Sequence, residues 1–382
     1  MRPAAALTAL TALTALTALL APAASPAPAQ DGPPAPAGEA SVVAGVPLQF
    51  PRDDGSHPLF GIEWWYVTGW LYTAKHHPLG FQITFFRIRP TTQSANPSDL
   101  TARQLLIAHC ALSDPAHGQL WQDQRIRRAG LGLAQAAVGD TDVWMDDWRL
   151  QRHGAPGQPD VYDASIPAQQ FALRLRFTAT MPPMLNGQNG FSQKGPSPRS
   201  ASYYYSVPQL RITGSVVRDG RRDRVTGIGW LDHEWASEYL DPRAQGWDWV
   251  GLNLADGGAA MAFEIRDRQG HPYWAAGTLR DAQGHTHSLG RAAIQFTPLR
   301  TWRSSHSGVR YPVAERVRIG SQQFELTPLM DDQEFDARLS AGALYWEGAV
   351  SATSAISGTS ATRTIARGYL ELTGYDRPLS LR

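Results

Sequence analysis

Residues 247–266 read WDWVGLNLADGGAAMAFEIR. Two short runs rich in aromatic and aliphatic side chains flank Ala255-Asp256-Gly257-Gly258. Asp-Gly and Gly-Gly accept positive φ, so they suit the tight turn of a β-hairpin. A second hairpin is predicted nearer the N-terminus, where Glu63–Tyr72 passes through a loop at 73–80 and returns as Phe81–Arg89. These stretches predict antiparallel strands rather than helices.

The two hairpins resemble each other, and similar segments continue in the same order through both halves of the chain. The matching segments are Tyr66-Val67 and Trp249-Val250, Phe86–Arg89 and Phe263–Arg266, Ala108–Asp114 and Ala275–Asp281, Trp148-Arg149 and Trp302-Arg303, Gln169–Leu173 and Gln322–Leu326, Tyr204-Tyr205 and Tyr345-Trp346, and Gly229–Asp232 and Gly368–Glu371. The offset between partners shrinks steadily, as deletions in the second copy would produce. Seven collinear matches indicate an internal duplication, and chance likeness between aromatic-rich strands is the alternative.

Past residue 45 the chain shows almost no helical periodicity. Short aromatic or β-branched runs alternate there with Gly, Pro, Asp and Asn, which predicts an all-β fold. We place the domain boundary after Trp235, so that two tandem domains span residues 45–240 and 241–382. Each suits an antiparallel sandwich or barrel, and a barrel of about eight strands has room for one small apolar ligand.

The first 29 residues have the features of an export signal. Arg2 gives a positive start, Ala4–Leu20 is an uncharged run, and Ala27-Pro28-Ala29 offers a small-x-small cleavage site. The run is short and rich in Ala and Thr for a membrane span, and an uncleaved anchor is the alternative. Residues 30–44 are expected to form a disordered Pro/Ala-rich linker. We therefore expect an exported protein, located in the periplasm or secreted.

The charge balance excludes one class of partner. The chain has 35 Lys and Arg residues against 34 Asp and Glu, without a basic stripe, so nucleic acid is not expected to bind. Thirteen Trp, 12 Tyr and 12 Phe instead fit half-buried strands and the walls of apolar pockets. Cys110 is the sole cysteine of the chain, which rules out an internal disulfide and a cysteine-based metal site.

The strongest chemical cluster is Asp232-His233-Glu234-Trp235. Side chains alternate along a strand, so Asp232 and Glu234 share one face while His233 and Trp235 share the other. Two carboxyl groups about 7 Å apart can divide the roles of acid and charged base when burial separates their pKa values, and a histidine can serve as acid, base or orienting group. We take these four residues as the candidate catalytic group. A solvated edge strand is the alternative.

Further candidates for ligand binding are Glu63-Trp64-Trp65 and His109. Aromatic surroundings are expected to raise the pKa of the Glu63 carboxyl group, and a surface position is the alternative. His109 interrupts an apolar strand, where a functional histidine and a hydrogen-bonded core histidine are equally expected. A metal site is not expected, because strand neighbours point to opposite faces, and no cofactor is implied.

At these residues the chain resembles the AttH and carotenoid 1,2-hydratase (hydroxyneurosporene synthase) family. The motifs that carry the resemblance are Gly61–Tyr66, Gly80–Arg87, Asp232–Trp235, Gly246–Trp249, Tyr345–Gly348 and Gly368–Tyr375. They extend over nearly everything after residue 45. The resemblance implies two lipocalin-like barrels, in agreement with the duplication, and a cleft lined by both lobes.

Hydratases of this family add water to a terminal C=C bond of an acyclic carotenoid without a cofactor. An acid protonates the alkene, water captures the tertiary cation, and aromatic rings stabilise that cation through their negative faces. His233 and Trp235 match the first half of the family pattern, His-x-Trp followed by aromatic-x-Asp. In the second half, Glu264 stands in place of the aspartate, which departs from the pattern.

AttH-type relatives accompany ABC-transporter permeases of the lipoprotein-release type, which with the export signal favours lipophilic ligands. Our leading hypothesis is an exported protein that binds a long apolar ligand, an isoprenoid or a lipid, and hydrates or hydrolyses it. Asp232 or Glu234 is the expected acid and His233 its proton partner. The expected pocket walls are Trp65, Trp235 and Trp249. A non-catalytic periplasmic carrier that serves an ABC-transporter permease, and a structural β-protein without a ligand, are the alternatives.

Overall fold

The chain folds almost entirely into antiparallel strands. The computed structural model describes residues 38–90, 103–155, 157–355 and 362–379, which belong to one compact unit. Within these residues, helical structure is limited to two single turns of 3-10 helix, η1 (Arg52–Asp54) and η2 (Arg291–Ala293). No helix in the described part is long and apolar enough to cross a membrane. The predicted export signal and the start of the predicted linker lie outside the described residues.

Thirteen strands form the first sheet, which with its loops we call the N-terminal lobe. In chain order they are β1 (Ile62–Thr73), β2 (Pro78–Ile88), β3 (Leu105–Ser113), β4 (Leu120–Arg128), β5 (Ala134–Ala136), β6 (Asp142–Met145), β7 (Trp148–His153), β8 (Val161–Pro167), β9 (Phe171–Thr178), β10 (Met184–Leu185), β11 (Phe191–Gln193), β12 (Ala201–Arg218) and β13 (Arg221–Ala236).

Ten strands form the second sheet, which with its loops we call the C-terminal lobe. They are β14 (Ala244–Leu254), β15 (Ala259–Asp267), β16 (Pro272–Arg280), β17 (Thr286–Gly290), β18 (Ile294–Arg303), β19 (Arg310–Ile319), β20 (Gln322–Pro328), β21 (Glu334–Ala337), β22 (Ala343–Ala355) and β23 (Thr362–Thr373). The chain passes from one sheet to the other between β13 and β14, in the segment that contains the predicted domain boundary.

The strand order reflects the duplication. The first sheet runs β4-β3-β2-β1-β13-β12-β9-β8-β7, and the second runs β17-β16-β15-β14-β23-β22-β20-β19-β18, so the strands correspond one to one. β6 and β5 extend the first sheet beyond β7. The residue register agrees at the centre, since Asp232 of β13 lies opposite Tyr66 of β1 while Glu371 of β23 lies opposite Trp249 of β14. The sequence comparison had matched Tyr66 with Trp249 and Asp232 with Glu371.

The sequence match on the second strand of each hairpin is displaced by two residues in the structure. Tyr66 lies opposite Thr84 rather than Phe86, whereas Trp249 lies opposite Phe263. Phe263 therefore corresponds to Thr84, two residues from its sequence partner. A slip of two residues leaves the side chain on the same face, because strand side chains alternate with a period of two.

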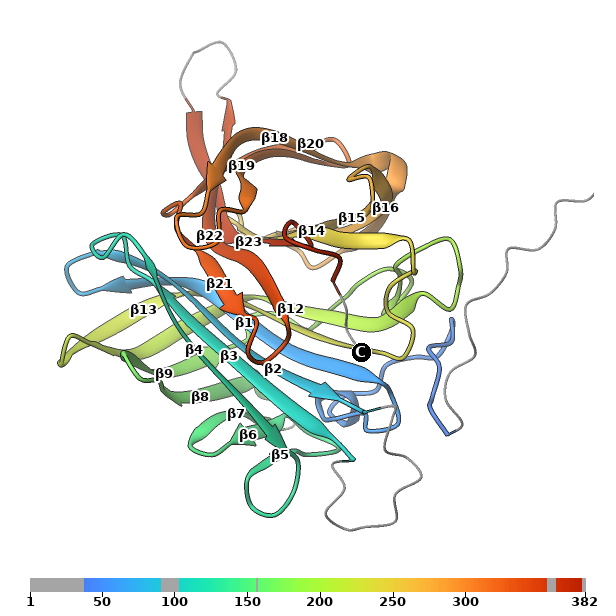
Figure 1. The fold of residues 1–382 in the computed structure, drawn as a ribbon, viewed down its shortest axis with the longest axis horizontal. Helices are drawn as coiled ribbons and strands as arrows, with labels where there is room; N and C mark the ends of the chain where they lie inside the picture. The colour runs from blue at the N-terminus through green and yellow to red at the C-terminus, as the bar shows by residue number, and fades with distance from the viewer. Residues whose placement is uncertain (1–37, 91–102, 156, 356–361, 380–382) are drawn as a thin grey trace, which may run out of the picture. The chain divides into compact units, whose positions relative to one another are not determined.

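Both sheets curl. In the second, β18 lies beside β15 and β16, which nearly closes the sheet into a barrel (Figure 1). In the first, the edge strands β4 and β5 follow each other in the chain. An all-β fold of two related antiparallel sheets confirms the predicted fold class.

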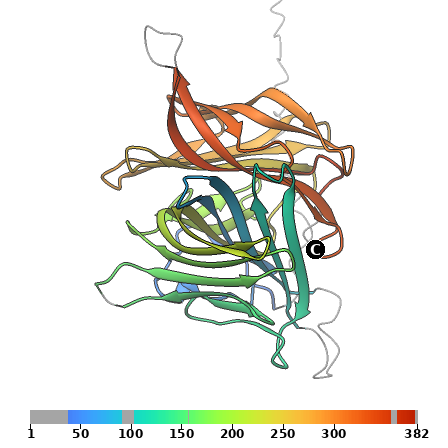
Figure 2. The same ribbon diagram turned by 90° about the vertical axis from the view of Figure 1, so that its left-hand side faces the viewer.

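A buried apolar cluster joins the two lobes, in addition to one core inside each lobe. It combines Tyr66 and Trp230 of the N-terminal lobe with Trp249, Phe263 and Tyr369 of the C-terminal lobe. Figure 2 shows strands of the C-terminal lobe lying across the sheet of the N-terminal lobe. Because apolar area removed from water contributes about 25 cal/mol per Å², these large rings fix the lobes against each other.

Gly368 sits at a close approach within this interface. The indole N–H of Trp70 in the N-terminal lobe donates to its carbonyl oxygen at 3.0 Å. A Cβ atom at Gly368 would overlap the backbone carbonyl of Gly251 on β14. Glycine is required here because two backbones approach too closely to admit a side chain.

Gly368→Ala should lower the free energy of unfolding by about 1–3 kcal/mol, the range for overpacked buried positions. Gly290→Ala is the matched control in the same sheet, because a Cβ there meets nothing within 4 Å. Urea unfolding of both variants and the wild type makes the comparison. Equal midpoints for the two variants would show that the contact between β14 and β23 tolerates a methyl group.

Candidate functional site

A buried pocket lies between the two lobes. Its enclosed space is about 60 Å³, enough for a few water molecules. The lining residues are Ile62, Trp64, Tyr66, Thr84, Phe86, Lys194, Tyr204, Asp232, Glu234, Tyr239, Trp247, Trp249, Phe263, Ile265, Glu347 and Glu371. Aromatic rings and carboxyl groups dominate this surface.

Each lobe contributes an acid from the same position of its sheet. On β13, Asp232 lies between Ser206 of β12 and Tyr66 of β1. On β23, Glu371 lies opposite Glu347 of β22. Because the strands correspond one to one, Asp232 and Glu371 are equivalent positions of the two copies, and both border the pocket.

Asp232 is held by three donors. Its Oδ1 accepts hydrogen bonds from Ser206 Oγ at 2.6 Å and from Trp230 Nε1 at 2.7 Å. Its Oδ2 accepts from the Tyr204 hydroxyl at 2.8 Å. Burial raises the pKa of Asp232 to about 7, although these hydrogen bonds stabilise the charged form. The carboxyl group can therefore change its charge near neutral pH.

Glu234 forms a buried ion pair. Its Oε1 lies 2.8 Å from Lys194 Nζ and also accepts a hydrogen bond from Ser202. The ammonium group lies over the rings of Phe263 and Tyr204, 4.1 and 4.8 Å from their centroids. Burial raises the pKa of Glu234 and lowers that of Lys194, and their mutual attraction opposes both shifts. Aromatic faces and a carboxylate together hold the cation away from solvent.

Glu347 and Glu371 form the acidic pair of the C-terminal lobe. Burial raises the pKa of Glu371 to about 8; repulsion from Asp232 adds to this shift and a hydrogen bond from Trp247 opposes it. Burial and the charge of Glu371 raise the pKa of Glu347 well above its usual range. Glu347 Oε2 and the hydroxyl of Tyr66 are buried without a hydrogen-bond partner.

The charges of the pocket do not balance when every group is ionised. Lys194 is the one basic side chain among the described lining residues, and it faces four carboxyl groups. Full ionisation would leave a surplus of three negative charges in a buried, aromatic space. Burial without compensation favours the neutral form of an acid, and it raises the pKa values of Asp232 and Glu371 to about 7 and about 8.

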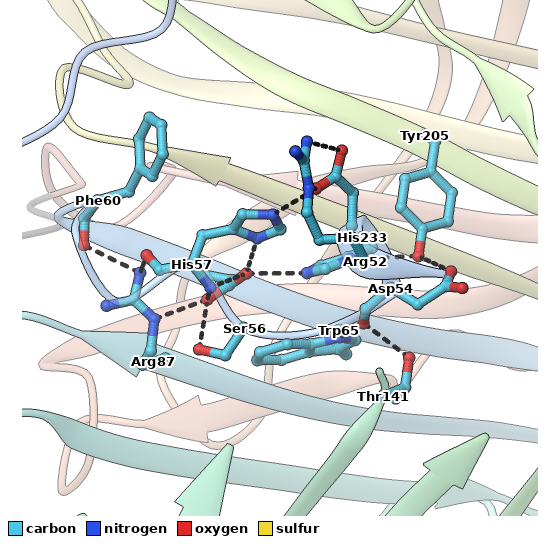
Figure 3. A network of polar contacts seen from close by, with 12 residues as sticks. Arg52, Asp54, Ser56, His57, Phe60, Trp65, Arg87, Thr141, Tyr205 and His233 are labelled. Carbon is cyan, nitrogen blue, oxygen red and sulfur yellow. Dashed lines mark hydrogen bonds and ion pairs between the residues drawn. The ribbon is translucent and has the colours of Figure 1, made fainter. Parts of the chain in front are cut away.

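The opposite face of β13 points into the N-terminal lobe. His233 Nε2 lies 3.0 Å from Glu63 Oε1, which also contacts His57 Nδ1 at 2.7 Å, and Arg87 Nε donates to Glu63 Oε2 at 2.7 Å (Figure 3). Trp235 stacks on His57 with ring centroids 3.8 Å apart. The predicted alternation along the strand is therefore found. It separates His233 from both acids, so the prediction that His233 is their proton partner is wrong.

The environment of Glu63 differs from the sequence expectation. Burial alone would raise the pKa of this carboxyl group, but Arg87, His233 and His57 outweigh burial and hold the pKa well below its usual range. Glu63 is thus a charged anchor inside the N-terminal lobe. The sequence expectation was wrong because the paired arginine comes from another strand, β2.

The same network contains the group of side chains most suited to a metal ion in the described part of the chain. One ligand atom each from His57, Glu63 and His233 lies within 4.8 Å of the others. Arg87 and both imidazoles already satisfy the carboxylate, and the Tyr205 hydroxyl lies 3.2 Å from His233 Nδ1. The network closes on itself without an ion, and we do not propose a metal site.

The predicted wall residues and the further ligand-binding candidate Trp64 divide between the two faces of their strands. Trp64 and Trp249 line the pocket. Trp65 and Trp235 instead belong to the core of the N-terminal lobe, because each lies one residue out of phase with the pocket face. Glu264 lies opposite Asp248 inside the C-terminal lobe and does not line the pocket.

His109 joins the two lobes away from the pocket. Its Nδ1 lies 2.6 Å from the Tyr345 hydroxyl and its Nε2 lies 2.7 Å from Ser340 Oγ. Burial lowers the pKa of His109 to about 3, so the imidazole is neutral. Of the two interpretations left open, the structure shows the hydrogen-bonded core histidine.

Sequence reasoning missed the residues that come from the second copy and from loops. Glu371 appeared as the counterpart of Asp232 in the duplication and Glu347 as part of a family motif, but neither was chosen as a site residue, and Lys194 was not considered. The available signal was a lone charge within an apolar run, as in LYWEGAV around Glu347 and GYLELTG around Glu371.

Fold and site together define a class: two-lobed all-β proteins with an acidic, aromatic-walled pocket between related sheets. The chain belongs to the AttH-like family, whose model matches residues 41–375. A crystal structure of an AttH-type protein from Nitrosomonas europaea is 50% identical and covers 88% of this chain and 99% of its own, with a TM-score of 0.79. A comparison with curated protein sequences returns no match.

Two more distant structures share the fold. Kievitone hydratase from Nectria haematococca is 15% identical, covers 91% of this chain and 98% of its own, and has a TM-score of 0.63. CghA, solved with Sch210972, is 12% identical, covers 83% and 89%, and has a TM-score of 0.52. At these identities the likeness concerns the fold.

Lys194→Met should destabilise the protein by about 3–5 kcal/mol, the cost of leaving one partner of a buried pair uncompensated. The loss should be greater at pH 8 than at pH 5, because an unpaired buried Glu234 carries a raised pKa and its charged form opposes folding as pH rises. Urea unfolding at both pH values tests this. Lys194→Met combined with Glu234→Gln should recover most of the loss; a double variant as unstable as the single one would contradict the pairing.

His57→Gln should destabilise the protein by about 1.5–3 kcal/mol below pH 6, the worth of hydrogen bonds to charged groups. Burial opposes the charge of His57, but Asp53 and Glu63 outweigh burial and raise its pKa. A raised histidine pKa contributes stability fully below its ordinary value of 6.5 and loses it as pH rises through the folded value. The difference between wild type and variant in urea unfolding should therefore narrow from pH 6 to pH 9. A constant difference would show that His57 is neutral when folded.

Proposed function

We propose that this protein adds water to a carbon–carbon double bond of an apolar ligand, without a cofactor, in the pocket between its lobes. The observation that carries the proposal is the pocket itself, where four carboxyl groups share a buried aromatic space with one lysine. Acids that are neutral near pH 7 are the groups that can donate a proton there. Unsaturated carbon is a substrate that needs such a donor and no redox group.

The chemistry follows from the lining. A carboxyl group donates its proton to one alkene carbon, and a cation forms at the other carbon. The faces of Trp64, Trp249 and Phe263 stabilise that cation, and carboxylates nearby lower its energy further because the site excludes bulk water. A water molecule then attacks the cation and returns a proton to a carboxylate. The space of about 60 Å³ admits the water and the reacting end of a ligand.

The comparisons support this class of reaction indirectly, through proteins that share the fold. A protein with the same fold bears the name kievitone hydratase, and another was solved with Sch210972. The proposal extends that kind of chemistry to this chain on the strength of its own pocket. The isoprenoid or lipid nature of the ligand, its length, export and an ABC-transporter permease as partner stay predictions.

Isotope-labelled water provides the test. The full chain is incubated with two probes, a dimethylallyl-substituted phenol and a short acyclic isoprenoid, in H₂¹⁸O and separately in D₂O. Mass spectrometry should find an alcohol that carries the labelled oxygen, or one deuterium on carbon. Ile265→Trp, which fills the pocket, should abolish the product, whereas Glu325→Gln, at a half-buried position outside the pocket lining, should not.

Two outcomes would overturn hydration. A probe that binds the wild type with a measurable Kd, and is released unchanged, would favour the carrier function instead. Equal product from wild type and Ile265→Trp would place the reaction outside this pocket.

A further inference from the structure

Asp232 is poorly arranged to release a proton. Both of its oxygens accept hydrogen bonds from Ser206, Trp230 and Tyr204. The Tyr204 hydroxyl accepts from Trp249 Nε1 at 3.0 Å, and an indole N–H can only donate. The Tyr204 hydroxyl in turn donates to Asp232 Oδ2 at 2.8 Å. Three donors aimed at one carboxyl group match its charged form.

Glu234 is occupied in a similar way. Lys194 Nζ and Ser202 Oγ both contact its Oε1. An adjacent ammonium group favours the carboxylate over the neutral acid. Neither acid that the sequence analysis chose is free to present a proton to a ligand.

Glu347 and Glu371 are arranged differently, although Glu371 accepts a hydrogen bond from Trp247. They lie directly across from each other on β22 and β23, and both line the pocket. Residues opposite each other on one sheet face have Cβ atoms about 4.5–5.5 Å apart. Glu347 Oε2 has no hydrogen-bond partner, and the Tyr66 hydroxyl beside the pocket has none either. A buried carboxyl oxygen without a donor is costly as an anion, and two facing carboxyl groups relieve the cost by sharing a proton.

We propose that the proton donor of the pocket is the Glu347–Glu371 pair of the C-terminal lobe, while Asp232 of the N-terminal lobe is the fixed carboxylate that faces it. This inference rests on the proposed hydration. Asp232 and Glu371 are equivalent positions of the two copies, so their different roles follow from the residue that lies opposite each of them. In the first copy Ser206 stands opposite the acid and donates to it, whereas in the second copy Glu347 stands there and repels it.

The O–H bond of the protonated pair breaks, its electron pair stays on the carboxyl oxygen, and the alkene π electrons form the new C–H bond. Water bonds to the resulting cation through its oxygen. The protonated alcohol then gives its extra proton to the same carboxylate, which restores the donor. The Tyr66 hydroxyl is placed to hold the water.

Infrared difference spectroscopy shows which carboxyl group is protonated, and it needs no substrate. The pKa of Asp232 is about 7 and that of Glu371 is about 8, so the spectra are recorded at a pH between these values. The spectrum of the wild type minus that of Glu347→Gln/Glu371→Gln should show the carbonyl stretch of a neutral carboxyl group. Wild type minus Asp232→Asn should show an ionised carboxylate. The reverse assignment would overturn the proposal. Circular dichroism and the Tm of each variant confirm that it folds.

Turnover gives the second reading, with the probes and D₂O as above. Replacing the pair with glutamines should reduce deuterium transfer to carbon by about 10²–10⁴-fold, the usual worth of a general acid. Glu315→Gln is the matched control, because Glu315 is a buried acid of the same lobe whose pKa burial also raises, yet it does not line the pocket. The Glu315→Gln variant should lose the infrared band of one neutral carboxyl group and keep the turnover of the wild type.

Different results would contradict the two proposals, hydration and the assignment of the proton donor. Wild-type turnover that survives in Glu347→Gln/Glu371→Gln would overturn the assignment of the donor and leave hydration standing. A neutral acid at the pair without turnover of any probe would support the assignment and count against hydration.

Discussion

Alternation of side chains along β13 is the constraint on which the rest of the molecule depends. One strand supplies two interiors: Asp232 and Glu234 enter the pocket between the lobes, while His233 and Trp235 enter the core of the N-terminal lobe. Because the period is two, no small rearrangement can bring all four residues to one site. The strand thereby couples a charged structural network on one side to a pocket of acids with raised pKa values on the other.

Much of the fold was accessible from the sequence, because turn chemistry and collinear repeats are local signals. Hairpins around Gly257 and the match of Asp232 with Glu371 needed no knowledge of three-dimensional contacts. The site was accessible in part: alternation placed the two acids of β13 on one face, and Trp64 and Trp249 were among the residues expected to bind a ligand. Glu347 and Lys194 were not, because their contribution depends on how the second sheet and a loop pack on the first. The charge state of Glu63 was missed for the same reason, since Arg87 reaches it from a neighbouring strand.

Duplication also explains why the pocket is asymmetric. Two copies of one sheet pack with equivalent faces toward each other, so equivalent acids meet across a small space. The copies then differ in what surrounds each acid. Asp232 has two hydroxyl donors and an indole donor, whereas Glu371 has an indole donor, Trp247, and a second carboxyl group opposite it. Neither lobe alone encloses the space, so the pocket belongs to the pair of lobes rather than to either sheet.

The hydrogen bonds of His109 join the two lobes at a second place, away from the pocket. Any motion that lifts β22 from the N-terminal sheet must break the bonds from His109 to Tyr345 and to Ser340. A residue outside the pocket therefore helps to hold β22, the strand that carries Glu347, against the N-terminal lobe.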